Sequence, residues 1–321
     1  MDELEESKDR GPSPRKFKDL KPENKKKRKE LPKPWGRRER LLVLVVFLAL
    51  VFLSLVLSLS SRNFKLPGLP RLRLPTFNWG SETIVIEGNK KERERVEAVK
   101  NSFNDLTRAL SGLYSLYIID LPTALVYGVS EKEVMQAASL IKLPIMSLVY
   151  QKYEEGKINI NEKVPGSQST YKDLVEAMGK RSDNNAQITL VKSLGKEEIQ
   201  RYIEGIGMLT TSLAENETTP ADIGLFFQKL WENKLVSQES RDEILNFLTD
   251  TTFEDWIVKG IPQVRVAHKY GREIHVVNDA GIIFTAEPFV LVIMSDGIVE
   301  KEADEVIPRI AKMVYDIEGA R

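Results

Sequence analysis

The pattern of apolar and polar positions divides the chain into three parts. Residues 1–40 are rich in Lys, Glu and Pro and lack the apolar periodicity that a packed core requires. Leu41 to Leu59 is apolar throughout, apart from the mild polarity of Ser54 and Ser58. Helix-like and strand-like patterns then alternate to the end of the chain. We therefore expect a disordered tail, one apolar helix over 41–60 and a folded domain over 86–321.

The apolar run has the length of a helix that crosses a membrane, which needs about 20 residues. A buried core helix would usually keep a polar stripe, and this run has none. A cleaved signal peptide usually has a short charged region and a small-x-small cleavage site. Here 40 residues precede the run, and Ser58-Leu59-Ser60 is a poor cleavage site. An uncleaved anchor, contacting the membrane through residues 41–59, is therefore favoured.

The distribution of charge orients this anchor. Residues 1–40 carry 15 Lys or Arg against 9 Asp or Glu, and the remainder carries 32 against 38. Basic residues concentrate on the cytoplasmic side of membrane helices, so the N-terminus is expected in the cytoplasm and the folded domain outside the cell membrane. The basic residues that flank the run are Arg37, Arg38 and Arg40. Residues 61–85 contain Pro67, Pro70 and Pro75 and are predicted to form a stalk.

The folded region predicts an α+β domain. Five strands and two terminal helices would form a five-stranded antiparallel sheet flanked by the helices, with an all-helical subdomain inserted between the second and third strands. The predicted helices are Lys91–Leu110, several from Ser139 to Leu248, and Lys301–Glu318. The predicted strands are Leu116–Asp120, Ala124–Tyr127, Val264–Lys269, His275–Phe284 and Phe289–Met294.

Composition excludes several classes of function. The mildly acidic domain has no aromatic residues interleaved with basic runs and no zinc-ligand spacing, so nucleic-acid recognition is not expected. The chain has no cysteine, which excludes disulfides, thiolate metal sites and a cysteine nucleophile. We expect no metal and no cofactor. The only histidines, His268 and His275, are expected to be packed or partly exposed rather than catalytic.

Ser139-Leu140-Ile141-Lys142 carries the strongest indication of chemistry. Residues three apart are neighbours on a helix, so Lys142 can reach the hydroxyl of Ser139. A serine hydroxyl needs an adjacent base, and a lysine can act as that base only if its pKa is lowered. The positive end of the helix dipole favours both a neutral lysine and an attacking alkoxide.

The pattern alone is weak, because Ser-x-x-Lys occurs at Ser13, Ser139, Ser169 and Ser193. The usual explanation of such a pair is a solvated serine beside a surface lysine. Ser139 differs because it opens an apolar helix and is followed by Ser182-Asp183-Asn184 and then by Lys269-Tyr270-Gly271. Each of the two later patterns occurs once in the chain.

With these three motifs in this order, residues 90–318 resemble the superfamily of class A β-lactamases and penicillin-binding proteins, whose motifs are S-x-x-K, S-D-N and K-[ST]-G. Three further stretches add to the resemblance, namely Lys180–Ala186, Thr218–Asp222 and Asn278–Gly281. The resemblance implies a β-lactamase-like fold and a substrate that is a β-lactam or a D-Ala-D-Ala-type peptide of peptidoglycan.

The resemblance also implies a role for each motif residue. Ser139 would attack a carbonyl, Lys142 would take its proton, and Ser182 would relay a proton to the leaving nitrogen. Asn184 would bind the substrate amide, and Lys269 would supply positive charge for the relay and for the substrate carboxylate.

Backbone groups would complete the implied site. The N–H groups of Ser139 and Arg272 would hold the oxyanion, where loss of one donor typically costs about 10²–10³ in rate. Gly271 would leave room for the substrate at the strand edge.

Two departures separate the chain from the class A pattern. Class A enzymes hydrolyse the acyl-enzyme with a glutamate in the Ω-loop, but Glu215 and Glu217 lack the expected E-x-x-L-N context. Tyr270, a candidate substrate-binding residue by its place in the motif, replaces the Ser or Thr that helps to bind the substrate carboxylate. Strand alternation would turn Tyr270 to the face opposite Lys269.

Three functions remain open at this stage. The first is a β-lactamase-like serine acyl hydrolase. The second is a D,D-peptidase or penicillin-binding protein, which the missing Ω-loop glutamate favours because its acyl-enzyme would be long-lived. The third is a catalytically weak domain that keeps the fold for binding.

Overall fold

The computed structural model describes residues 41, 43–52, 54 and 90–319, and the chain divides into two compact units, Met1–Arg71 and Leu72–Arg321. In the first unit the described residues between 41 and 54 are helical. Among the described residues, no helix is both long enough and apolar enough to cross a bilayer. The predicted anchor is described only in part, so it stays a prediction. The predicted tail and stalk lie outside the described residues.

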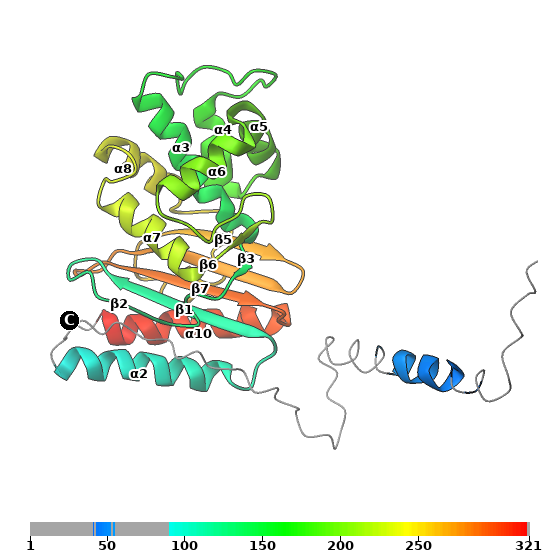
Figure 1. The fold of residues 1–321 in the computed structure, drawn as a ribbon. Helices are drawn as coiled ribbons and strands as arrows, with labels where there is room; N and C mark the ends of the chain where they lie inside the picture. Colours follow the sequence, from blue (N-terminus) through cyan, green and yellow to red (C-terminus); the bar gives the residue numbers. More distant parts are fainter. Residues whose placement is uncertain (1–40, 42, 53, 55–89, 320–321) are drawn as a thin grey trace, which may run out of the picture. The chain divides into compact units, whose positions relative to one another are not determined.

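The second unit contains the predicted five-stranded antiparallel sheet, which confirms that part of the α+β assignment (Figure 1). The strand order is β2-β1-β7-β6-β5, so the two ends of the domain's sequence meet in the middle of the sheet. The edge strands are β2 and β5. The strands are β1 (Leu113–Asp120), β2 (Val126–Val129), β5 (Val266–Glu273), β6 (Val276–Ile283) and β7 (Phe289–Asp296).

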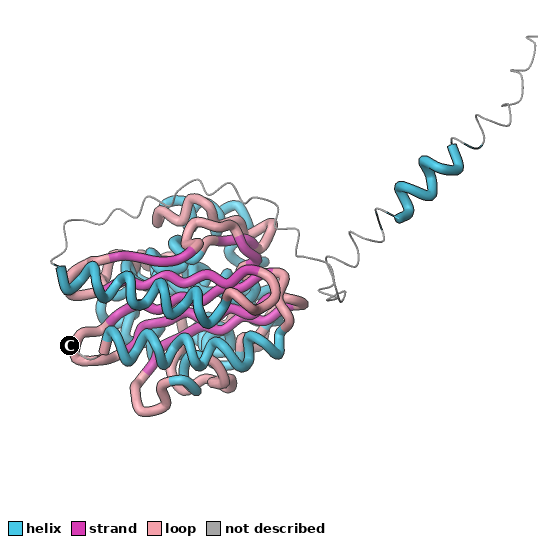
Figure 2. The backbone as a smooth tube through the Cα atoms, turned by 90° about the horizontal axis from the view of Figure 1, so that it is seen from below, coloured by secondary structure: helices cyan, strands magenta, loops and turns pink. Residues whose placement is uncertain are grey.

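The two terminal helices cover one face of this sheet, as Figures 1 and 2 show. They are α2 (Lys90–Thr107) and α10 (Glu300–Glu318). Each buries residues at helical spacing, such as Val96, Val99 and Phe103 in α2. These side chains share a core with the sheet residues of that face and with the short helix α9 (Ile257–Gly260). We call this side of the sheet the terminal-helix face.

The opposite face, which we call the site face, packs against α7 (Pro220–Trp231) and the inserted helical subdomain. The apolar helix that follows Ser139 is buried along almost its whole length. The helices of the subdomain are α3 (Lys142–Glu154), α4 (Tyr171–Arg181), α5 (Asn184–Leu194), α6 (Lys196–Gly205) and α8 (Gln238–Phe247).

Some predicted boundaries of strands and helices were wrong. The error at the end of β5 matters most for the site. The predicted strand ended at Lys269, whereas β5 pairs with β6 as far as Glu273 opposite Val276. His275, predicted to begin the next strand, lies in the turn with a φ of 62°. A small second sheet of β3 (Met135–Gln136) and β4 (Glu217–Thr218) was not predicted, because two-residue strands carry no periodicity.

Candidate active site

Ser139 lies in a short 3-10 helix, η2 (Ala138–Ile141), that leads directly into α3. The residue before it, Ala138, has a φ of 48°, which is uncommon for a residue with a side chain and is a form of strain found near active sites. Two hydrogen bonds hold the backbone segment that precedes Ser139. The Ala137 N–H donates to the Asn216 carbonyl at 2.7 Å, and Asn278 Nδ2 donates to the Gln136 carbonyl at 2.8 Å.

The Ser182-Asp183-Asn184 motif forms the corner between α4 and α5. Ser182 ends α4 in the left-handed conformation, with φ 54° and ψ 35°. Asp183 then caps α5, because its Oδ1 accepts from the Ala186 N–H at 2.9 Å. The sharp turn at Ser182 and the cap at Asp183 together direct Ser182 and Asn184 toward Lys142.

Lys142 is fully buried at the centre of this arrangement. Its Nζ donates to the Ser182 carbonyl and to Asn184 Oδ1, each at 2.7 Å. It also lies 2.8 Å from Ser139 Oγ and 3.2 Å from Ser182 Oγ. A neutral amine has two hydrogens and one lone pair. The two pure acceptors can take both hydrogens, which leaves the lone pair for the hydroxyl of Ser139.

Burial also favours the neutral amine, because it lowers the pKa of Lys142 to about 8. The negative charges of Asp183 and Glu273 oppose this shift. An amine with a pKa near 8 is neutral in a substantial fraction of molecules at physiological pH. Lys142 can therefore accept the proton of Ser139 without first being deprotonated at high pH.

Lys269 is the second buried lysine, and it projects from β5 on the site face. Burial lowers its pKa well below the usual value, and the positive charge of Lys142 lowers it further, while Asp279 opposes both. Its Nζ donates to the Tyr270 carbonyl at 2.7 Å and lies 3.9 Å from the centre of the Tyr270 ring. The two lysines are thus electrostatically coupled although no hydrogen bond joins them among the described contacts.

Tyr270 packs with the core of the terminal-helix face, as strand alternation predicts. Its ring lies against Phe253, with centroids 5.0 Å apart, and its hydroxyl is 3.3 Å from Thr252 Oγ1. Although the two side chains start from opposite faces of the strand, the Lys269 amine reaches the face of the Tyr270 ring. His268 also lies on this face, where its Nδ1 is 2.7 Å from Asp279 Oδ1 and both side chains are fully buried.

Gly271 lies against Ser139. A Cβ at this position would be 2.8 Å from the Ser139 nitrogen and 3.0 Å from Ala138 Cβ. Only glycine permits so close an approach between the strand edge and η2. The structure shows that this glycine leaves room for the backbone of Ser139. The further expectation that it leaves room for a substrate stays a prediction.

The N–H of Arg272 lies at the free edge of β5. The His268 N–H donates outside the sheet, to the Leu248 carbonyl at 2.7 Å. Backbone groups of alternate residues in an antiparallel strand point to the same side, so the N–H of Arg272 also points away from β6. Its side chain does not enter the site, because Arg272 Nη2 bonds Asp304 Oδ2 on α10 at 3.0 Å. The backbone nitrogens of Ser139 and Arg272 thus flank Gly271.

Residues 206–219 connect α6 to α7, which is where the resemblance to class A enzymes would place the Ω-loop. Glu215 is exposed and Glu217 belongs to β4, and neither influences the pKa of Lys142. The carboxylate that this loop contacts instead is Glu273, which accepts from Asn216 Nδ2 at 3.0 Å. Asn216 Oδ1 is buried and accepts no hydrogen bond within the described part of the chain.

The sequence did not reveal two polar residues of the site, Asn216 and Glu273, or the role of a third, Asn278. Asn278 was noted only as part of a similar stretch, yet it holds the segment before Ser139. Glu273 could have been found from strand alternation, since it is two residues beyond Gly271, if β5 had been predicted to continue. Asn216 has no local pattern that would reveal it, because its partner is 57 residues away.

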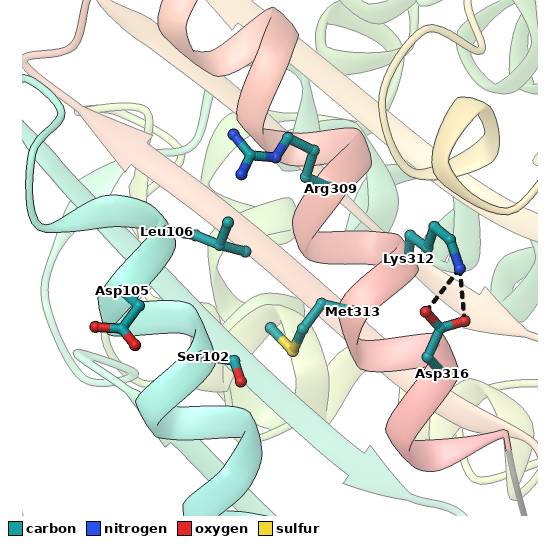
Figure 3. Close-up of a pocket in the computed structure, with 7 residues that line it drawn as sticks. All are labelled: Ser102, Asp105, Leu106, Arg309, Lys312, Met313 and Asp316. Atoms are coloured by element: carbon teal, nitrogen blue, oxygen red, sulfur yellow. Dashed lines mark hydrogen bonds and ion pairs between the residues drawn. The ribbon is translucent and has the colours of Figure 1, made fainter.

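A separate groove of about 460 Å³ lies on the terminal-helix side, between α2 and α10 (Figure 3). Two of the polar side chains that line it pair with each other, because Lys312 donates a hydrogen bond to Asp316. It is separated from Ser139 by the sheet. Among the described residues, no group of three or more His, Asp or Glu side chains could hold a metal ion.

Comparison with known proteins gave consistent matches. The model of the family described as "Beta-lactamase enzyme family" matches residues 98–317. Among solved structures, PBP-A is 23% identical with a TM-score of 0.64, covering 68% of this chain and 95% of PBP-A. A β-lactamase from Sphaerobacter thermophilus has the same identity and TM-score, covering 70% and 98%. An ancestral class A β-lactamase is 21% identical with a TM-score of 0.63, covering 68% and 99%.

Proposed function

The chain belongs to the β-lactamase enzyme family, and from that premise we propose that it is a serine acyl hydrolase that forms an acyl-enzyme on Ser139. Its proposed substrates are β-lactams or related amides of the cell wall. The observation that carries the proposal is the buried amine of Lys142, held 2.8 Å from Ser139 Oγ while Ser182 and Asn184 accept its hydrogens.

In the proposed acylation, Ser139 Oγ attacks the carbonyl carbon and its proton passes to Lys142 Nζ. The developing oxyanion lies between the N–H groups of Ser139 and Arg272. The carbon–nitrogen bond then breaks, and the hydroxyl of Ser182 gives its proton to the leaving nitrogen. Lys142 Nζ, 3.2 Å from Ser182 Oγ, returns the proton to that hydroxyl, so an ester on Ser139 remains.

Hydrolysis of this ester requires an activated water. The carboxylates of the 206–219 loop are Glu215 and Glu217. Among the described interactions, no hydrogen bond or ion pair joins either of them to Ser139 or Lys142. This observation favours a second candidate function, a penicillin-binding protein or D,D-peptidase whose acyl-enzyme decays slowly. The two candidates share the acylation step and differ only in the lifetime of the ester.

We further propose that residues 41–59 anchor the protein in the cell membrane, with the N-terminus in the cytoplasm and the catalytic domain outside. The support is the unbroken apolar sequence, the flanking arginines and the helical conformation of the described residues from 41 to 54. This location would place the site beside peptidoglycan.

A fluorescent penicillin tests the proposal and separates the two candidates. The purified full-length protein should become labelled, and the Ser139→Ala variant should not. Equal labelling of both proteins would refute the assignment of the nucleophile. After removal of free ligand, loss of label within seconds would identify a lactamase, and retention for hours would identify a binding protein or peptidase.

A further inference from the structure

Glu273 is a carboxylate at the rim of the site to which the proposed reaction gives no role. It lies on β5 two residues beyond Gly271 and four beyond Lys269, so all three belong to the site face of the strand. Its side chain is exposed, and among the described residues it forms no ion pair. Its charge is nevertheless close enough to Lys142 to raise the pKa of that amine.

The 206–219 loop holds this carboxylate in place. Asn216 Nδ2 donates to Glu273 Oε1 at 3.0 Å, and the Asn216 carbonyl accepts from the Ala137 N–H at 2.7 Å. Ala137 is two residues before Ser139. Glu273 is therefore linked through one residue to the segment that carries Ser139. It lies beside the site, and no ion pair within residues 90–319 compensates its negative charge.

The site face of β5 thus presents three different properties in a row. Lys269 offers an amine that can donate hydrogen bonds, Gly271 offers contact with Ser139, and Glu273 offers negative charge. About 13 Å of strand separates the first from the last. The backbone groups of Tyr270 and Arg272 lie along the free edge, where an extended ligand can add as a further strand.

A ligand along this edge meets these properties in order. Its leaving-group side, with a carboxylate in the proposed substrates, lies toward Lys269. Its scissile carbonyl lies at Ser139 and Gly271. Its acyl side therefore extends toward Glu273. We propose that Glu273 forms a subsite for a cationic group on the acyl side of the substrate, so that the enzyme favours acyl groups that carry an ammonium.

This inference rests on the proposed function, and three penicillins with related side chains test it. Ampicillin carries an ammonium on its acyl side chain, benzylpenicillin carries no charge there, and carbenicillin carries a carboxylate. Rates of acylation of the full-length protein are measured below the pKa of the ampicillin amine. Glu273→Gln should slow ampicillin about two- to fivefold and accelerate carbenicillin by a similar factor relative to benzylpenicillin, as expected for an exposed charge pair.

The ratio of ampicillin to carbenicillin is the decisive quantity. Glu273→Gln also lowers the pKa of Lys142, but this changes all three rates together and leaves the ratio unaffected. The matched control Glu305→Gln removes one exposed negative charge from α10, on the other side of the sheet, and should leave the ratio unchanged. In the wild-type protein, high salt should also reduce the ratio.

Two outcomes would overturn the subsite. In the first, Glu273→Gln changes the three acylation rates by the same factor. In the second, acylation is unchanged and hydrolysis of all three acyl-enzymes slows equally, which would assign Glu273 to activation of water. If none of the three penicillins acylates Ser139, the proposed function fails and the subsite fails with it.

Discussion

At Lys142, burial and hydrogen bonding act on a single amine. The S-x-x-K spacing predicted that Lys142 can reach Ser139, because residues three apart on a helix are neighbours. It could not predict that Ser182 and Asn184 accept two hydrogens of the amine, since those residues lie 40 and 42 positions away. The three motifs had to be brought together before the lone pair of Lys142 could be assigned to the hydroxyl of Ser139.

The pKa of Lys142 predicts how acylation depends on pH. The neutral amine is the active form, and it becomes dominant above its pKa of about 8. The second-order rate of acylation by benzylpenicillin should therefore rise about tenfold per pH unit well below 8 and level off above it. Stopped-flow measurement between pH 5 and 9.5 checks this. A rate that stays constant or falls over this range would contradict the role of Lys142 as base.

Gly271 gives a second prediction at the scale of the residue. Gly271→Ala would place a Cβ 2.8 Å from the Ser139 nitrogen, so the strand and η2 must separate. Misplacing the oxyanion donors should slow acylation about 10²–10³-fold. Gly205→Ala in α6 is the matched control, because a Cβ there meets no atom within 4 Å. Acylation of Gly271→Ala at the wild-type rate would show that the close approach is not needed.

Among the elements, β5 shows what could and could not be predicted from sequence. Alternation correctly assigned Lys269 and Tyr270 to opposite faces of the strand. The end of the strand was wrong, because polar residues Arg272 and Glu273 continue it as far as a turn at Ile274 and His275. An exposed sheet edge tolerates polar residues, so composition alone does not mark where the ladder stops.

Two neighbouring residues of β6 form hydrogen bonds on opposite faces of the sheet. Asn278 faces the site side, where it donates to the Gln136 and Ala137 carbonyls and accepts from the Ser295 N–H at 3.0 Å. Asp279 faces the terminal helices, where it binds His268 and accepts from the Ile257 N–H at 3.0 Å. Sequence similarity identified this stretch, but only the sheet shows that its two polar residues act on opposite faces.

Alanine substitutions should separate these two functions. Asp279→Ala leaves buried donors without an acceptor, and it should reduce the free energy of unfolding by about 3 kcal/mol. Its acylation rate under native conditions should fall less than that of Asn278→Ala, since Asp279 influences the site only through the charge of Lys269. Asn278→Ala should also slow acylation, up to about 100-fold, because the segment before Ser139 is released. Urea denaturation and acylation kinetics measure both effects, and equal losses of activity in the two variants would contradict this division.

In the folded domain as a whole, the motif residues gather on the site face of the sheet, and the terminal-helix face packs against α2, α9 and α10. The terminal helices close one face, while η2, α4 and α5 bring the motif residues together on the other (Figure 1). Hydrophobic periodicity was sufficient to predict the order of the five main strands and the two terminal helices along the chain, but not the short strands β3 and β4. It could not predict the pairing of Asn216 with Glu273, which depends on how a loop and a strand edge meet in three dimensions.

The proposed anchor predicts where the whole protein is found. Full-length protein should stay with the membrane fraction after alkaline extraction and enter solution with detergent. A variant that lacks residues 1–60 should be released, because the apolar segment has been removed. Protease added to intact spheroplasts should digest the catalytic domain of the full-length protein. Protection of that domain would contradict the proposed orientation.

The central claim is that Lys142 activates Ser139 for attack on an acyl carbon, and intact-protein mass spectrometry tests it most directly. After exposure to benzylpenicillin, the full-length protein should gain the mass of one penicillin, and peptide mapping should place it on Ser139. The Ser139→Ala variant should gain nothing, and Lys142→Arg should react about 10²–10⁴-fold more slowly, because its guanidinium cannot accept the proton. An adduct on another residue, or one that forms equally fast in Lys142→Arg, would contradict the claim.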